Sequence, residues 1–253
     1  MWSCCLSTKS SFCQAVVQTG LLTERQMVHA ALRYRLGCSK ENAVIYWQID
    51  QLGQTHDGKL MWYGPDCHRV KHRHATWASH LLKRHYGVPD EVYQPVHCFF
   101  GLHLLALGSG PSPKFCSYHD LSPALKTKDR GLTPVPSFSV AIVEAEKTAV
   151  ILSELYPQYI WLAAGGMNEL QTNKFFPIRH HKVILFPDTD SDLTAFTRWY
   201  NAAQEVMASF FWPKSNPIRV SPILERCATP DQKRRKIDLV DYLLEKRATL
   251  RPE

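Results

Sequence analysis

The chain has 253 residues, enough for one large domain or two small ones with a substantial buried core. Its composition is 45% hydrophobic and 21% charged, which excludes a disordered or fibrous protein. Lysine plus arginine number 30 against 23 aspartates plus glutamates, so the formal net charge is +7 and favours a polyanionic partner. No apolar run reaches the roughly 18 residues of a membrane helix, and the start has no signal-peptide pattern. We therefore expect a cytoplasmic protein that does not bind membranes.

The eight cysteines contain no CxxC pair, so they predict neither a disulfide framework nor a zinc ribbon. Histidines and cysteines gather at two places. One group is Cys67, His68, His72 and His74, and the other is His97, Cys98 and His103. Because neither group has the paired spacing of a structural zinc site, zinc is not expected.

Residues 1–107 are expected to form a small α+β unit of basic character. A capping-box pattern starts at Thr23, and the apolar spacing after it predicts a helix that ends near Gly37. The β-branched and aromatic runs Val44–Ile49 and Lys59–Tyr63 predict two strands joined by a turn. After this unit, residues 108–137 concentrate proline, glycine and serine, which indicates a linker or long loop.

Residues 138–253 show a different pattern, with short apolar runs and segments of helical length between most of them. The runs are Val140–Val143, Tyr159–Leu162, Val183–Phe186 and Ile218–Val220. Uninterrupted apolar strands alternating with helices are typical of a parallel sheet buried on both faces. The predicted class is therefore α/β, closing with a helix near residues 237–244.

A basic stretch crosses the first unit, and aromatic residues are interleaved with it. Its main members are Arg69, Lys71, Arg73, Trp77, Lys83 and Arg84. Basic side chains neutralise phosphates and aromatic faces stack on unpaired bases, so one interpretation is a groove for single-stranded nucleic acid. The alternative is a solvated helical face with Trp77 in the core. The sequence leaves both open.

Carboxylates follow two of the predicted parallel strands. Glu144 comes directly after the first strand, and Asp188, Asp190 and Asp192 come after the third. If these strands are neighbours, the carboxylates meet at one edge of the sheet, where Mg²⁺ or Mn²⁺ would relieve their repulsion. The alternative is that strand ends simply meet solvent there and collect polar residues.

These features together resemble a toprim domain, the metal-binding module of DnaG-type primases, topoisomerases and some nucleases. The resemblance covers about residues 138–246 and is carried by the segments Glu144–Lys147, Gly165-Gly166, Asp188-x-Asp190 and Asp238-Leu-Val-Asp241. The earlier segments Val44–Asp50, Gly58–Met61 and Cys98–Leu105 are similar to those of primase-like proteins from bacterial mobile elements. The resemblance implies a toprim-like Rossmannoid parallel sheet preceded by a smaller α+β unit.

The resemblance also implies roles for individual residues. Glu144 would act as general acid/base or metal ligand, Asp188 and Asp190 would hold Mg²⁺ with Asp192 beside them, and Lys147 would lie near a phosphate. The sequence departs from the family pattern in two places. Ala145 stands where a glycine usually follows the glutamate, and no glycine follows the aspartates.

The activity implied is Mg²⁺- or Mn²⁺-dependent phosphoryl transfer on nucleic acid, in the form of primer synthesis by a DNA primase-like nucleotidyltransferase. Single-stranded DNA, nucleotides and a helicase or other replication protein would be its partners. Two alternatives stay open, a toprim nuclease and a non-catalytic single-stranded DNA-binding accessory protein of a mobile element. Relatives often carry an N-terminal zinc segment, but Cys4, Cys5 and Cys13 are spaced too irregularly for one, so a truncated or degenerate relative is expected.

Overall fold

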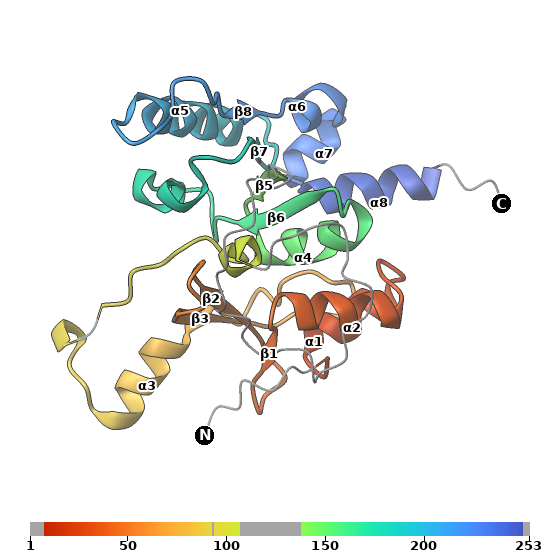
Figure 1. Ribbon diagram of the computed structural model, residues 1–253. Coiled ribbons are helices and arrows are strands. Elements are labelled where there is room, and N and C mark those ends of the chain that lie inside the picture. The colour runs from red at the N-terminus through yellow and green to blue at the C-terminus, as the bar shows by residue number, and fades with distance from the viewer. Residues whose placement is uncertain (1–7, 93, 107–137, 250–253) are drawn as a thin grey trace, which may run out of the picture.

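The computed structural model of the protein describes residues 8–92, 94–106 and 138–249 (Figure 1). It contains two four-stranded sheets, one antiparallel and one parallel, so the class is mixed α/β as predicted. The predicted linker at 108–137 lies outside the described residues, as do Cys4 and Cys5. Among the helices that are described, none is long and apolar enough to cross a membrane.

The antiparallel sheet lies in the first part of the chain and has the order β1-β2-β3-β4. Its strands are β1 (Gly37–Cys38), β2 (Val44–Ile49), β3 (Thr55–Met61) and β4 (Thr76–Trp77). β2 occupies the predicted residues, whereas β3 begins four residues before Lys59. The early start is explained by a tight turn in which Asp50 Oδ1 accepts the amides of Leu52 (2.8 Å) and Gln54 (2.9 Å).

Three helices accompany this sheet, namely α1 (Ser11–Gln18), α2 (Glu24–Arg33) and α3 (Ala78–Tyr86). The predicted capping box is confirmed, because Thr23 and Gln26 each accept the other's backbone amide. α2 ends at Arg33, sooner than the predicted limit near Gly37. α1 has no counterpart among the predicted elements. Figure 1 shows α3 reaching away from the rest of the molecule.

The parallel sheet has the order β6-β5-β7-β8, and every neighbouring pair in it is parallel. Its strands are β5 (Ser139–Val143), β6 (Tyr159–Ala163), β7 (Val183–Phe186) and β8 (Arg219–Val220). The four apolar runs therefore form the predicted sheet. The helices α4 (Glu146–Leu155) and α5 (Thr194–Ala208) lie on opposite sides of it in Figure 1.

Short helical segments complete the described chain. They are η1 (Asp90–Val92), η2 (Leu102–Leu105), η4 (Thr172–Ile178), α6 (Ile223–Cys227), α7 (Pro230–Arg235) and α8 (Leu239–Thr249). The last of these corresponds to the predicted final helix.

The two sheets share one hydrophobic core, which runs from α1 and α2 to α4, β5 and β6. The backbone of Phe100 pairs with Ala163 at the outer edge of β6, with N···O distances of 3.0 and 3.1 Å. The buried Tyr34 hydroxyl donates to the Trp161 carbonyl across the same junction at 2.8 Å. These contacts hold the antiparallel sheet against the parallel one, which brings β3 beside the start of α4.

Candidate functional site

Two strands of the parallel sheet deliver carboxylates to the same edge. β5 and β7 are adjacent and parallel, with Val143 opposite Phe186, so the predicted adjacency is confirmed. Glu144 follows β5 directly, and Asp188 follows β7 after one residue. Burial raises the pKa of Asp188, and the charge of Glu144 adds to this effect. The two side chains therefore lie close enough to interact at the carboxyl edge.

Two more aspartates reach this edge from the start of α8. Asp238 caps the helix, since its Oδ1 accepts the Asp241 amide at 2.8 Å, while its Oδ2 accepts the Thr148 hydroxyl at 2.7 Å. Lys147 Nζ lies 3.3 Å from Asp238 Oδ2 and 3.5 Å from Asp241 Oδ1. Lys147 is thus held between carboxylates rather than at an open phosphate position. The spacing Asp-x-x-Asp before the last apolar helix is the sequence signal for this pair, although the spacing alone assigns it no role.

We call Glu144, Asp188, Asp238 and Asp241 the carboxylate cluster. Burial raises the pKa of Asp188 well above its usual range, and the charges of Asp238 and Glu144 add to the effect. Burial likewise raises the pKa of Glu144 and of Asp241. Burial also opposes ionisation of Asp238, but the charge of Lys147 and the hydrogen bonds from the Asp241 amide and the Thr148 hydroxyl together outweigh it and lower that pKa. The cluster therefore contains more carboxylates than Lys147 neutralises.

A buried ion pair borders the cluster and joins the two sheets. Glu146, the first residue of α4, accepts two hydrogen bonds from Lys59 Nζ of β3, at 3.1 and 3.2 Å. The same ammonium group donates to the Gly165 carbonyl at 2.9 Å. Gly165 has a φ of +93°, a conformation that favours glycine. Lys59 and Glu146 are 87 residues apart in sequence, so no local pattern predicts that they meet.

Asp190, a predicted metal ligand, accepts hydrogen bonds from backbone amides at the start of α5. Its Oδ1 accepts the amides of Asp192 (3.0 Å) and Thr194 (2.8 Å), and its Oδ2 accepts that of Ala195 (2.8 Å). Although burial acts against ionisation, these bonds lower the pKa of Asp190. Both oxygens are therefore used to start α5. The Asp192 side chain, which also belongs to the predicted ligand set, is exposed.

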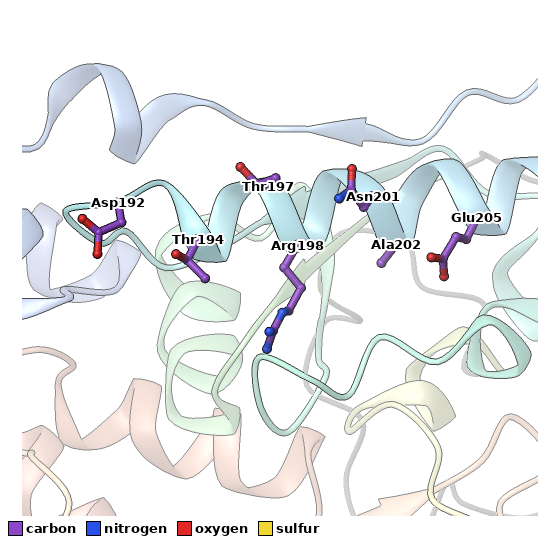
Figure 2. Close-up of a pocket in the computed structure, with 7 residues that line it drawn as sticks. All are labelled: Asp192, Thr194, Thr197, Arg198, Asn201, Ala202 and Glu205. Atoms are coloured by element: carbon purple, nitrogen blue, oxygen red, sulfur yellow. The ribbon is translucent and has the colours of Figure 1, made fainter.

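An open groove of about 490 Å³ runs along the exposed face of α5 (Figure 2). Its lining residues are Asp192, Thr194, Thr197, Arg198, Asn201, Ala202 and Glu205. Arg198 donates to the Asn168 side chain in the loop that follows β6, and the Met167 backbone of that loop hydrogen-bonds Glu144. Arg198 thus links the groove to the loop that contacts Glu144.

The basic stretch divides into a part near the cluster and a part far from it. The connection between β3 and β4 lies near, because His68 interacts electrostatically with Asp241 and offsets a small part of the rise in pKa that burial causes there. Arg69, Lys71 and Arg73 extend from this connection and are exposed. Arg73 pairs with Glu41 at 3.2 Å and lies 5.0 Å from the Trp62 ring.

The distant part is α3, which carries Lys83 and Arg84. Trp77 precedes this helix and is half-buried, with its ring stacked on His97 at a centroid distance of 4.0 Å. The start of α3 is fixed by Asp57, which accepts the Ser79 hydroxyl at 2.6 Å and the Ser79 amide at 3.0 Å. Trp77 is thus neither a core residue nor a free stacking platform.

The donor chemistry of the carboxylate cluster fits Mg²⁺. Within the described ranges, no three His, Cys, Asp or Glu side chains form a ready-made metal-binding group. Mg²⁺ is usually held by only one or two carboxylates, with waters and substrate phosphates as its other ligands. Glu144 and Asp188 supply two hard oxygen donors, and burial together with the neighbouring carboxylates raises the pKa of both.

Comparison with known proteins identifies the family. A model described as a domain of unknown function, DUF6371, matches residues 10–112 and 131–189, well over half of the chain. The chain belongs to the DUF6371 family. The DUF6371 match includes Lys59, Glu144, Lys147 and Asp188, whereas Asp238 lies beyond it. No curated protein matches this DUF6371 chain.

Among solved structures, this DUF6371 protein is similar to the primase fragment of the bacteriophage T7 primase-helicase protein. The TM-score is 0.47 and the sequence identity 13%, over 87% of this chain and 66% of that one. The chain therefore spans slightly less than two thirds of the T7 fragment. At this score and identity the similarity does not by itself assign an activity.

Proposed function

We propose that the protein catalyses Mg²⁺-dependent phosphoryl transfer on nucleic acid, in the form of primer synthesis on a single-stranded DNA template. The observation that carries the proposal is the convergence of Glu144 and Asp188, with Asp238 and Asp241, at the carboxyl edge of a parallel sheet. Active sites of open α/β sheets lie at this edge. The resemblance of the surrounding segments to toprim domains supports the same class of reaction.

Each residue of the site has a part in this proposal. Glu144 and Asp188 would hold Mg²⁺, which supplies positive charge to the transferring phosphate when it is bound. Because burial raises the pKa of Glu144, its carboxylate is a stronger base than that of an exposed glutamate and would accept the proton of the attacking hydroxyl. Asp238 and Asp241 keep Lys147 directed into the cluster.

The nucleic acid would approach over the connection between β3 and β4. His68 on this connection is close enough to influence Asp241, and the exposed Arg69 and Lys71 follow it directly. Basic side chains at this position can neutralise the phosphates of a strand whose end enters the cluster. The net charge of +7 agrees with such a partner.

Primer-extension and nuclease assays on single-stranded DNA, with nucleotides and Mg²⁺ or Mn²⁺, test the proposal. We expect synthesis by the natural protein and a loss of at least about 100-fold in Glu144→Gln, the range of a general acid or base. DNA affinity should stay within about twofold, because ground-state phosphate contacts remain.

Asp231→Asn is the matched control, since it removes a carboxylate that is 62% exposed on α7 and should leave turnover unchanged. Cleavage of the DNA without synthesis would mean that the site catalyses a nuclease reaction and not a primase reaction. Binding of DNA without synthesis, cleavage or Mg²⁺ binding would contradict an enzyme and favour an accessory protein.

A further inference from the structure

A row of phenylalanine side chains lies at the end of the parallel sheet opposite the carboxylate cluster. Phe176 comes from η4, and Phe210 and Phe211 come from the turn after α5. The centroid distances are 5.6 Å from Phe176 to Phe211 and 5.8 Å from Phe211 to Phe210. Phe210 is fully exposed and Phe176 is 49% exposed. We call these three residues the aromatic row.

Buried neighbours hold the aromatic row in place. Phe175 and Trp212, each next to a member of the row, are buried and face each other edge-on at a centroid distance of 6.2 Å. Trp212 Nε1 donates to the Asn216 carbonyl at 2.6 Å, and Asn216 Nδ2 donates to the carbonyls of Arg179 (3.1 Å) and His181 (2.7 Å). The two segments are therefore fixed to each other before any ligand binds, which lowers the entropic cost of binding.

The segments that carry the row are basic and contain no acidic residue. Neither 170–187 nor 206–224 includes an aspartate or glutamate. Their basic residues are Lys174, Arg179, His180, His181, Lys182, Lys214 and Arg219. Of these, Lys174 pairs with Glu169 at 2.8 Å, whereas Lys182, Lys214 and Arg219 are exposed. Arg179 lies over the Phe176 ring at 3.9 Å.

We propose that the aromatic row is a second contact site for single-stranded nucleic acid, away from the carboxylate cluster. The exposed faces of Phe210 and Phe176 would stack on unpaired bases, and Lys182, Lys214 and Arg219 would neutralise the adjoining phosphates. The charge of the surroundings favours this occupant over an apolar protein surface, because every charged side chain in the two segments is cationic. The inference rests on the proposed function, and it adds a second place at which the nucleic-acid strand is held.

Fluorescence anisotropy with labelled oligothymidylate tests the aromatic row. We expect Phe210→Ala to weaken binding roughly 5- to 150-fold, the measured range for removing one base–aromatic stack. Phe210→Trp should retain the affinity, whereas Phe210→Leu, which keeps apolar area without a π-face, should not. Leu52→Ala is the matched control, because Leu52 is 76% exposed and lies on the β2–β3 turn. An abasic strand should bind the natural protein and Phe210→Ala equally.

Three results would contradict a nucleic-acid site at the aromatic row and leave the proposed function intact. The first is unchanged DNA affinity of Phe210→Ala alongside weaker binding after replacement of Arg69 and Lys71. The second is full DNA affinity of Phe210→Leu, and the third is loss of self-association in Phe210→Ala with DNA binding intact, since either would assign the row to a protein contact. If the natural protein bound no single-stranded DNA, the proposed function would fail together with the row.

Discussion

The carboxylate cluster and the basic stretch are two charged regions of the molecule that differ in burial, since the cluster is largely buried and the basic stretch is largely exposed. In the cluster, burial raises the pKa of Asp188 and Glu144, so ionisation there is opposed unless a cation or proton is supplied. Arg69 and Lys71 of the basic stretch are exposed, so water solvates their charge whether or not a ligand is present. The buried carboxylates therefore need a cation or a proton to balance their charge, whereas water balances the charge of the basic stretch.

The same contrast separates two aspartates only two residues apart. Asp188 has its pKa raised by burial and by neighbouring carboxylates, whereas Asp190 has its pKa lowered because three amides outweigh its burial. Burial opposes ionisation of Asp188, whereas the amides at the start of α5 favour ionisation of Asp190. The two aspartates of an Asp-x-Asp pattern can thus lie in opposite electrostatic environments.

The largest effect on stability is expected from Lys59→Met. The Lys59 and Glu146 side chains are 13% and 2% exposed, so removing the lysine leaves an uncompensated buried carboxylate. We expect a loss of about 3–5 kcal/mol in the free energy of unfolding, measured by urea denaturation. The double variant Lys59→Met/Glu146→Gln should recover much of it. The control is Arg73→Met, which breaks the exposed pair with Glu41 and should cost less than about 1 kcal/mol. A loss as large as that of Lys59→Met would contradict the contrast between buried and exposed charge.

The next effect concerns Asp188, whose folded-state pKa is raised above its unfolded value. Such a group contributes stability when protonated and loses that contribution as pH rises through its folded pKa. In chelator, the natural protein should therefore lose stability as pH increases above the ordinary carboxyl range of about 4. Asp188→Asn should flatten this dependence, measured by thermal unfolding at several pH values.

Binding of Mn²⁺ gives a second test of the carboxylate cluster. At a free Mn²⁺ concentration about 100 times the dissociation constant, the free energy of unfolding of the natural protein should rise by about 2.7 kcal/mol. The stabilisation should grow with pH, because protons compete for the carboxylates, and Asp188→Asn should lose most of it. A natural protein whose unfolding ignored Mn²⁺ at every pH would contradict a cation site.

Sequence patterns predict the elements of this fold better than its site. The apolar runs at β5 and β7 and the capping box at Thr23 are local signals, and each produced the predicted element. The partnership of Lys59 with Glu146 depends on how the two sheets pack, which no local spacing records. The environments of Asp188 and Asp190 differ through tertiary burial and amide contacts, which the sequence pattern does not record. The pattern therefore predicts the same role for both aspartates.

A smaller effect is expected from Asp190→Ala. Its carboxylate accepts amides at the start of α5, so its loss should cost about 1–2 kcal/mol, as for other helix-capping side chains. Because the folded-state pKa is lowered, the contribution is present above the unfolded pKa and is lost as pH falls through the folded value. Mn²⁺ should stabilise Asp190→Ala as much as it stabilises the natural protein. If Mn²⁺ did not stabilise Asp190→Ala, Asp190 would be a ligand of the cation. The exposed Asp192→Ala should change stability by less than about 0.5 kcal/mol.

The smallest effect on stability, and a distinct effect on binding, is expected in the basic stretch. Replacing Arg69, Lys71, Arg73, Lys83 and Arg84 by alanine removes mainly exposed charge, so each change should alter stability by about 0.5 kcal/mol or less. If these side chains bind phosphates, the slope of log affinity against log salt should fall by about 0.7 for each phosphate of a single strand that is no longer neutralised.

The two parts of the stretch can be separated in the same titration. The variant of Arg69, Lys71 and Arg73 should flatten the salt dependence more than that of Lys83 and Arg84, because the first group follows His68 beside the carboxylate cluster, whereas α3 reaches away from it (Figure 1). Equal flattening by both variants would extend the nucleic-acid interface along α3. An unchanged slope in the fivefold variant would mean that the stretch serves solubility, and the strand would then have to be held by other basic residues, such as those around the aromatic row.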